Sequence, residues 1–492
     1  MSQINESTIR TPGVYVNEIP SFPPSIAQVA TAIPAFIGYT QIALDANGQS
    51  LTNKPTKIGS LLEYETYFGT AQLETGITIT YTQVTNGSVS NDTISFAFAA
   101  SKKSLHNMHS ALRHFYANGG GDAYIVSVGP YKAPVGTALV ATDFFSAGSG
   151  KGLEAIAKES EPTLIVFPEG QNMVEANYYA LLGAALAQCG ALQDRFCIMD
   201  LFDTGQTIVT TAQLTTATTA FRSGLTTNFP NYGAAYYPNL KTVYSYDFDE
   251  SAVTVTHTVN AAAGPLNGQT LKAINDPTKA FFNSAAYNTL KSALTSQFPV
   301  VLPPSAAVAG IYASVDGSRG VWKAPANVGV MDVSGTTFNI SDDLQQNLNI
   351  DPVSGKSINA IRAFTGKGIL VWGARTLDGN SNDFRYISVR RFYIMVEESV
   401  KLAAMQFVFE PNDGNTWVRI RAMIENYLTN LWRLGALAGS KPEQAFYVKV
   451  GLGQTMIFDD ILNGKMIIEI GMAPVRPAEF IILRFSQIQQ QA

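Results

Sequence analysis

The last third of the chain carries hydrophobic residues at helical spacing, with charged residues between them. The first stripe comprises Val389, Phe392, Tyr393, Val396, Val400, Ala403 and Phe407. After a break at Glu410–Gly414, the second comprises Trp417, Ile420, Ile424, Tyr427, Leu428 and Leu431. The pattern predicts two packed helices, and Asn415 or Thr416 is placed to cap the start of the second one.

The middle of the chain has the pattern of a β-α-β unit. Residues 163–167 and 196–201 are continuous apolar runs, which are typical of strands buried on both faces. Residues 173–191 between them are rich in Ala and Leu and predict a helix. We therefore expect two parallel strands joined by a crossover helix, as in an α/β domain.

Upstream of this unit, two runs rich in Thr, Ile and Phe flank Asn86-Gly87, a favoured two-residue turn. They predict a β-hairpin within residues 77–100. A helix over residues 101–117 and a strand over residues 123–128 are expected to follow.

Two polar tracts, residues 206–220 and 245–276, are rich in Thr, Ala or turn residues. We expect them to decorate the outside of the α/β domain as insertions. Strand-like runs at residues 445–450 and 466–470 follow the two C-terminal helices, an order that suggests an α+β domain.

The first 40 residues are rich in proline and in β-forming residues. Val14, Tyr15 and Val16 form an extended stretch, and the prolines at positions 20, 23 and 24 forbid a helix after it. This segment is expected to be an extended arm.

The other end of the chain carries four consecutive apolar residues, Phe480, Ile481, Ile482 and Leu483. A strand of this kind is apolar on both faces and needs a partner on each. The prolines at positions 474 and 477 stiffen the connection before it. Two interpretations stay open: a terminal strand in the chain's own sheet, or a strand donated to a neighbouring subunit.

Composition narrows the function classes. Hydrophobic residues make up 46% of the 492 positions and charged residues only 14%, which excludes a disordered chain and leaves much surface for a partner to cover. The formal net charge of -5, without a Lys/Arg-rich run, argues against a nucleic-acid binder.

The two cysteines, Cys189 and Cys197, are expected to be buried free thiols. The N-terminal sequence shows no basic stretch followed by an apolar one, and no segment offers about 18 uninterrupted apolar residues. We expect a protein made in the cytoplasm without a signal peptide and without direct membrane insertion.

Motifs that suggest nucleotide binding are incomplete. Residues 148–152 (GSGKG) resemble the end of a phosphate-binding loop, but Phe145 and Gly152 occupy positions that require Gly and Ser or Thr. Gly451-Leu452-Gly453 begins a dinucleotide fingerprint that fails at Met456.

Polar clusters offer no better catalytic site. The histidines are His106, His109, His114 and His257. His106 and His109 could share a face of a helix, yet no further metal ligands are suitably spaced, so a polar helix face is expected. Asp316 and Arg319 fit a salt bridge that stabilises a turn. The sequence therefore predicts no enzyme activity, no catalytic or metal site and no cofactor.

Five segments resemble the sheath proteins of contractile phage tails and of extracellular contractile injection systems. They are residues 11–38, 309–327, 407–420, 431–439 and 470–485. They cover about a fifth of the chain and follow the family's order at both ends, whereas the middle of the chain carries little of the resemblance. Pro34 departs from the small or β-branched residue expected there, and it is expected to shorten that strand.

The resemblance implies a structural subunit that polymerises helically around an inner tube and contracts to drive the tube through a target envelope. It implies that strands at residues 14–16 and 480–483 reach neighbouring subunits and complete a sheet there. The implied partners are further copies of the chain, an inner tube protein, and baseplate and terminal cap proteins. The implied location is a phage tail or a phage-tail-like particle, including a released extracellular one.

The resulting fold prediction is an α/β outer domain plus an α+β core domain built from both chain termini, with extended β arms. The predicted parts are an N-terminal arm and first core strand (1–40), a variable α/β outer domain with β insertions (41–345), the α+β core (346–475) and a C-terminal arm (476–492). Arg419, Arg421 and Arg433 lie off the second helical stripe and could face an acidic tube surface. A solvated helix face is the alternative for each.

Two other function classes fit less well. Another tail component, such as a cap or baseplate protein, would add a few copies rather than a long array. An α/β enzyme would require one of the incomplete motifs to work.

Overall fold

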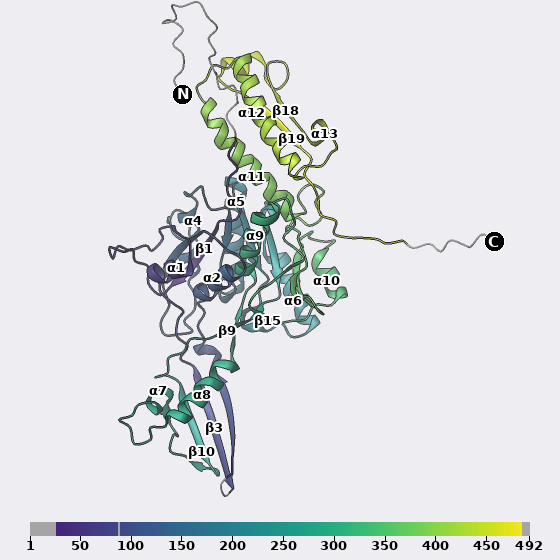
Figure 1. The fold of residues 1–492 in the computed structure, drawn as a ribbon. Helices are drawn as coiled ribbons and strands as arrows, with labels where there is room; N and C mark the ends of the chain where they lie inside the picture. Colours follow the sequence, from purple (N-terminus) through teal and green to yellow (C-terminus); the bar gives the residue numbers. More distant parts are fainter. Residues whose placement is uncertain (1–25, 87–88, 485–492) are drawn as a thin grey trace, which may run out of the picture. The chain divides into compact units, whose positions relative to one another are not determined.

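The computed structural model describes residues 26–86 and 89–484 (Figure 1). The predicted strand of Val14, Tyr15 and Val16 lies outside these residues. The described chain forms two compact units: residues 30–395 with 476–484, and residues 396–475 with 26–29.

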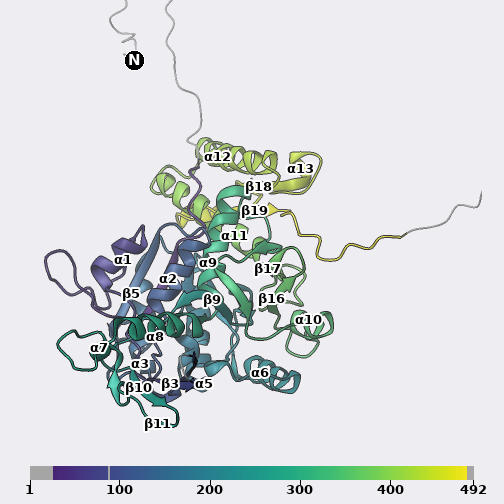
Figure 2. The same cartoon turned by 60° about the horizontal axis from the view of Figure 1, so that its bottom comes forward.

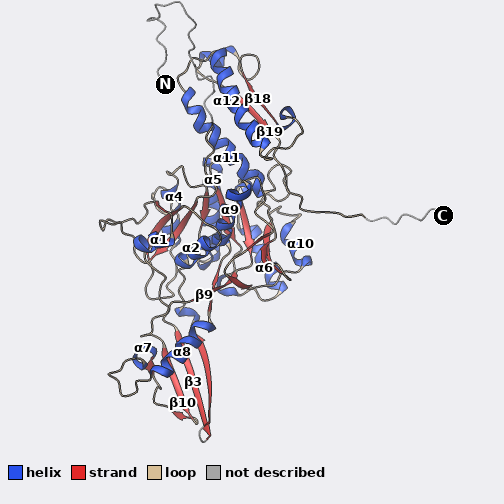
Figure 3. Cartoon of the chain, in the orientation of Figure 1, coloured by secondary structure: helices blue, strands red, loops and turns tan. Residues whose placement is uncertain are grey.

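A nine-stranded sheet organises the larger unit (Figure 3). In order across the sheet, its strands are β14 (Val328–Gly329), β17 (Gly368–Val371), β16 (Ile358–Phe364), β8 (Gly233–Tyr237), β7 (Phe196–Asp200), β6 (Leu164–Val166), β1 (Pro34–Thr40), β5 (Ala123–Pro130) and β2 (Thr56–Ile58). Neighbouring strands from β16 to β5 are parallel, and the outer pairings are antiparallel. The mixed α/β fold agrees with the prediction.

Strand β1 lies in the middle of this sheet. All seven of its residues are buried, and Phe36 is aligned with Val166 of β6 on one side and with Ile125 of β5 on the other. Pro34 begins the strand, where a missing N–H group is tolerated. The predicted first core strand therefore belongs to the large α/β unit and not to the C-terminal one.

The predicted β-α-β unit is confirmed. Strands β6 and β7 are parallel, with Leu164 opposite Phe196, and helix α5 (Glu175–Leu192) connects them. Cys189 and Cys197 are buried free thiols, as expected. Burial raises the pKa of Cys189 to about 12, so this thiol stays protonated near neutral pH.

The other helices around the nine-stranded sheet are short to medium in length. They are α1 (Leu61–Phe68), α2 (Met108–Ala117), α3 (Ala141–Phe144), α4 (Leu153–Ile156), α6 (Thr211–Gly224), α9 (Ser305–Arg319) and α10 (Asp342–Asn349). Single 3₁₀ turns lie at Ala100–Lys102, Gly170–Asn172, Thr204–Gln206 and Pro230–Tyr232. Helices α2 and α9 pack side by side against the sheet (Figure 1).

The predicted start of one helix needs correction. Helix α2 begins at Met108 and not at residue 101, because the side chains of Ser104 and His106 hydrogen-bond to the polar groups around them. The polar tract at residues 206–220 contains helix α6 from Thr211 onward. Thr210 and Gln213 build a capping box that starts this helix.

A second hydrophobic core lies in a smaller β-rich body of the larger unit (Figure 2). Its elements are β3 (Ile77–Asn86), β4 (Val89–Phe98), β10 (Thr254–Val259), β11 (Ala262–Ala263), β12 (Gln269–Thr270), α7 (Leu271–Ile274) and α8 (Ser284–Gln297). Strands β3 and β4 form the predicted antiparallel hairpin, and β10 pairs in parallel with β3. A three-stranded sheet of β13 (Pro299–Leu302), β9 (Leu240–Ser245) and β15 (Val333–Thr336) completes the larger unit.

The two helices predicted near the C-terminus are α11 (Ile387–Ala404) and α12 (Gly414–Arg433), with a 3₁₀ turn at Met405–Phe407 between them. The predicted stripe of α12 is buried from Ile420 to Leu431. The cap differs from the prediction: the carboxylate of Asp413 accepts a hydrogen bond from the backbone N–H of Thr416. An ionised oxygen at this position also interacts favourably with the helix dipole.

The smaller unit ends in a two-stranded sheet. Its remaining elements are α13 (Pro442–Ala445), β18 (Phe446–Val450), α14 (Phe458–Leu462) and β19 (Ile468–Met472). Strands β18 and β19 are antiparallel, and α12 packs against β18. Val448 and Val450 are buried, whereas Tyr447 and Lys449 alternate with them on an exposed polar face.

The predicted boundary at residue 345 is wrong. Strand β16 pairs in parallel with β8, Ile358 opposite Ala235, so residues 346–395 fold with the large sheet. The smaller unit begins at residue 396, inside α11.

Candidate functional site

The C-terminal segment exposes the four apolar residues that the sequence singled out. Phe480, Ile481, Ile482 and Leu483 are 67%, 78%, 78% and 71% exposed, and they form neither helix nor strand in the described chain. The interpretation as a strand of the chain's own sheet is therefore wrong for these residues. Contiguous exposed apolar side chains of this kind are typical of interaction surfaces.

Glu479, directly before this run, is fixed to the larger unit. Arg375 donates from Nε to both carboxylate oxygens, at 3.0 and 3.1 Å, and from one Nη to Oε2 at 2.7 Å. Asn349 donates to Oε1 at 2.7 Å, and the hydroxyl of Tyr386 donates to Oε2 at 3.2 Å. The carboxylate thus accepts hydrogen bonds from three side chains.

The electrostatics of this contact favour the ionised carboxylate. Burial alone would raise the pKa of Glu479, but the hydrogen bonds from Arg375 and Asn349 and the charge of Arg375 lower it below the ordinary value. The Arg375 side chain is only 4% exposed, so the pair is largely shielded from solvent. A partly buried pair with charge-assisted, bidentate hydrogen bonds is stronger than a surface ion pair.

The side chain of Asn359 holds the backbone of Arg375 in place. Its N–H donates to Asn359 Oδ1 at 2.8 Å, and its carbonyl accepts from Asn359 Nδ2 at 2.8 Å. One guanidinium nitrogen also donates to the carbonyl of Gly379 at 3.1 Å. The anchor of Glu479 is therefore hydrogen-bonded into the larger unit.

The other end of the described chain is held in a similar way. The carbonyl of Thr31 accepts a hydrogen bond from Arg391 at 2.8 Å, and the Thr31 hydroxyl donates to Asp316 at 2.6 Å. Arg391 itself pairs with Asp316, at 3.1 Å for its other nitrogen, and lies over the ring of Tyr312. Both charged side chains are nearly fully buried.

This contact corrects the prediction for Asp316 and Arg319. Asp316 lies on helix α9 and not in a turn, and its ion-pair partner is Arg391, far along the chain. Helix α9 continues to Arg319 and ends at Gly320, whose positive φ of 86° suits glycine.

The three arginines predicted to face a tube lie on α12 of the smaller unit. Arg419 pairs with Glu410 at 2.9 Å, and Arg421 donates to the carbonyl of Val450 at 2.7 Å. Arg433 is exposed at the last residue of the helix. Two of the three guanidinium groups therefore have partners within their own unit.

Comparisons with known proteins decide the family. The sequence pattern of the phage tail sheath C-terminal domain matches residues 380–488. The anti-feeding prophage helical sheath in its contracted state is 30% identical over 97% of this chain and 99% of its own, with a TM-score of 0.60. The sheath complex of the extracellular contractile injection system PVC, also contracted, is 29% identical over 97% and 98%, with a TM-score of 0.62.

This chain belongs to the contractile tail sheath family. The resemblance noted in the sequence is thus confirmed. Among phage relatives, the tail sheath protein of Vibrio phage KVP40 is 25% identical over 185 residues, or 37% of this chain and 26% of the relative. That of Burkholderia phage BcepMu is 28% identical over 28% of this chain and 30% of the relative. The chain therefore matches only about a quarter to a third of the length of these phage sheaths.

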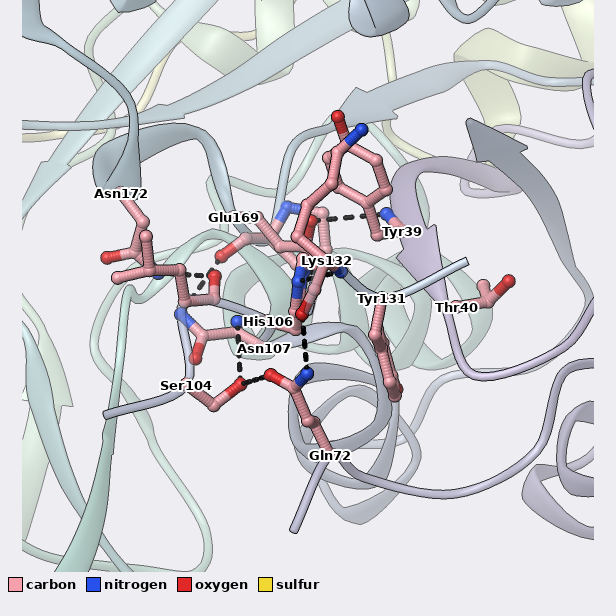
Figure 4. A network of polar contacts seen from close by, with 12 residues as sticks. Tyr39, Thr40, Gln72, Ser104, His106, Asn107, Tyr131, Lys132, Glu169 and Asn172 are labelled. Atoms are coloured by element: carbon pink, nitrogen blue, oxygen red, sulfur yellow. Dashed lines mark hydrogen bonds and ion pairs between the residues drawn. The ribbon is translucent and has the colours of Figure 1, made fainter. Parts of the chain in front are cut away.

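A buried polar network in the larger unit of this sheath protein includes His106, one of the histidines considered as a metal ligand (Figure 4). Glu169 accepts from the backbone N–H of Tyr39 at 3.1 Å and contacts His106 Nδ1 at 3.3 Å. Since His106 Nε2 accepts from the N–H of Lys132 at 3.0 Å, the ring proton is on Nδ1 and points to Glu169. Both ring nitrogens are occupied, and the network joins β1 to the loops around it.

The histidines do not share a helix face as predicted, since His106 precedes α2. The partners of the histidines are Glu169 for His106, Glu65 for His109, the Met331 carbonyl for His114 and Gln83 for His257. Over residues 26–86 and 89–484, no three His, Cys, Asp or Glu side chains are grouped to hold a metal ion. In the same ranges, no helix has the length and apolarity needed to cross a membrane.

The loop that resembled a phosphate-binding motif is filled by the chain itself. Gly148 and Gly150 donate their backbone N–H groups to the carboxylate of Glu154 at 2.7 and 2.8 Å. An acidic side chain thus takes the place where an anion would bind.

Sequence reasoning missed Glu479, Arg375 and Arg391. The signal for Glu479 was the single charge that directly precedes four apolar residues. For the two arginines, no local pattern points to partners about 100 and 360 positions away.

Proposed function

We propose that this chain is a sheath subunit that polymerises helically around an inner tube and contracts to drive the tube through a target envelope. Family membership supports this proposal, because two relatives that align over nearly the whole chain come from contracted sheaths. A relative from the anti-feeding prophage baseplate, 30% identical over 98% of this chain, supports contact with a baseplate.

Within this function, residues 14–16 and 480–483 are donated strands. The observation that carries the proposal is the exposed apolar run that begins directly after the anchored Glu479. The sheet of β18 and β19 offers a matching acceptor, since in the described residues it has only two strands. Such small sheets gain stability from further strands.

The remaining functional expectations follow from the family. The particle is a phage tail or a phage-tail-like injection machine, and the subunit works through assembly without catalysis. Arg433, exposed at the end of α12, is the first residue to test for contact with the tube, because Arg419 and Arg421 are bound within their own unit.

Electron microscopy of the protein co-expressed with its tube partner tests the proposal. The comparison is between the full chain and a chain that ends at Glu479, which keeps the anchor but lacks the apolar run. We expect striated tubular sheaths from the full chain and none from the shortened chain, although its circular dichroism and thermal transition match those of the full chain.

A pair of substitutions distinguishes a specific role of the arm from the general effect of placing a charge on the surface. Ile482→Asp should abolish sheaths, whereas Val353→Asp, at a residue 93% exposed on the larger unit, should leave them intact. If the full chain stays monomeric beside its tube, the sheath function is wrong. If sheaths survive both the truncation and Ile482→Asp, strand donation by this arm is wrong and the sheath function stands.

A further inference from the structure

One short segment of the larger unit contacts the chain at both arm roots. Residues 375–391 contribute Arg375 and Tyr386 to Glu479, at the start of the C-terminal run. They also contribute Arg391 to Thr31, at the start of the described N-terminal part. Arg375 and Tyr386 form a backbone bridge, and α11 begins directly afterwards at Ile387.

The two contacts share a chemistry. In each, a nearly buried arginine holds a carboxylate, Glu479 in one and Asp316 in the other. In the C-terminal contact, the carboxylate belongs to the arm itself. At the N-terminal root, Arg391 donates to the carbonyl of Thr31 and orients Asp316 toward the Thr31 hydroxyl. Charge-assisted hydrogen bonds from a planar guanidinium group resist displacement in more than one direction.

The contact with Glu479 matters because Glu479 lies directly before the exposed apolar run. The exposed run starts at Phe480, so no unanchored residue lies between Glu479 and the apolar side chains. If those side chains are held by another subunit, any pull on them reaches Glu479 first. Residues 475–478 do not have to unfold or stretch before the load reaches the larger unit.

We propose that residues 375–391 are a common anchor for both arms, and that the Arg375–Glu479 pair keeps the C-terminal arm root attached while neighbouring subunits pull on it. Arg375, Asn349 and Tyr386 are positioning residues: they set where the donated strand leaves the subunit. This inference rests on the proposed strand donation, but attachment of the arm root can be measured on the monomer alone.

Proteolysis of the full-length monomer measures the attachment. Chymotrypsin cleaves after Phe480 only when several residues on both sides, Glu479 included, enter its cleft. Mass spectrometry follows the release of the peptide that begins at Ile481. Because a charge-assisted pair contributes about 1.5–3 kcal/mol, Glu479→Gln should accelerate this cleavage at least about tenfold.

Three controls make the result specific. Asn349→Ala removes one donor and should accelerate cleavage less than Glu479→Gln does. Glu161→Gln breaks an exposed pair with Lys57 in the same unit and should leave the rate unchanged. The thermal transition of Glu479→Gln should equal that of the unaltered chain, which separates a local anchor from a role in overall stability. Equal cleavage rates in the unaltered chain and Glu479→Gln would overturn the anchor.

Sheaths assembled with the tube then test the anchor under load. After triggered contraction, the unaltered sheath and Glu161→Gln should remain continuous, whereas Glu479→Gln should separate into short rings. Continuous contracted sheaths from Glu479→Gln would show that the pair is not needed under load. Absence of sheaths from the unaltered chain would instead contradict the proposed function, and the proteolysis result would still decide the anchor.

Discussion

Thr31 donates its hydroxyl proton to Asp316 at 2.6 Å, across 285 positions of the chain. Asp316 also accepts hydrogen bonds from the guanidinium group of Arg391, which donates as well to the carbonyl of Thr31. Thr31, Asp316 and Arg391 thus form a closed cycle of hydrogen bonds. Thr31 lies three residues before strand β1 begins at Pro34. The cycle fixes where the chain enters the middle of the large sheet.

Removing the hydroxyl should weaken this cycle. Thr31→Val keeps the shape of the side chain but leaves one carboxylate oxygen of Asp316 with one donor fewer. We expect a loss of about 1–2 kcal/mol in the free energy of unfolding, measured with urea, because a hydrogen bond to a charged group is lost. Thr31→Ser keeps the hydroxyl and should lose clearly less. Equal stability of the valine and serine variants would contradict the assigned bond.

The start of helix α12 offers a test of capping. Asp413→Ala removes the acceptor for the Thr416 amide and should destabilise the first turn by about 1 kcal/mol. Amide exchange at Thr416 should then be about fivefold faster. Asn415→Ala is the matched control, since the sequence favoured that residue as a cap while the structure places it inside the exposed first turn. A larger effect from Asn415→Ala would contradict the cap assignment.

Phe409 has a strained backbone and no burial to offset the strain. Its φ is +69°, and it is fully exposed (103%) in the loop between α11 and α12. Because left-handed geometry costs an L-residue about 1–2 kcal/mol, Phe409→Gly should stabilise the monomer by up to about 1 kcal/mol after the added chain freedom is counted. Val408→Gly, at a φ of -65°, should destabilise it. Chemical unfolding of the two variants should therefore give shifts of opposite sign.

Glu74 should make the folded protein less stable as the pH rises, which is the opposite of the usual effect of a carboxylate. Burial raises its pKa to about 7, although the backbone N–H of Ser104 donates to its carboxylate at 2.8 Å. The folded protein keeps this proton to a higher pH than the unfolded chain, whose pKa is about 4.3. The contribution of Glu74 is therefore fully present below about pH 4 and is lost as the pH rises through 7.

Glu74→Gln removes this titration. The stability of the variant relative to the unaltered chain should rise by on the order of 2 kcal/mol between pH 5 and pH 8, measured by urea unfolding. Asp200 offers an independent site, because burial raises its pKa to about 7 as well, and Asp200→Asn should behave in the same way. A difference in stability that is the same at both pH values would contradict the assignment.

Elements defined by periodicity could be predicted from the sequence. The stripes that became α11 and α12 and the apolar runs of β6 and β7 each bury a face along one continuous segment, so local spacing carries the information. The same holds for the β3–β4 hairpin, whose turn residues and flanking runs lie within 22 positions.

Pairings between distant segments could not be predicted in this way. The run at Ile358–Phe364 looks like any strand, and only its alignment with β8 shows that it joins the large sheet. Asp316 was assigned to Arg319 because that charge is three residues away, whereas its partner Arg391 lies 75 positions along the chain. Glu479 carried no sign of its anchor for the same reason.

Among the described residues of the larger unit, the hydrophobic core around the nine-stranded sheet and the one between β3, β10 and α8 are separate clusters, and a small third cluster contains Tyr244, Val300 and Leu302. A change of side-chain volume deep in the second core, away from Phe98 and its contact with Tyr246, should therefore fall mainly on the β-rich body itself. The same independence makes that body the place where a sheath of this kind can be given a new surface.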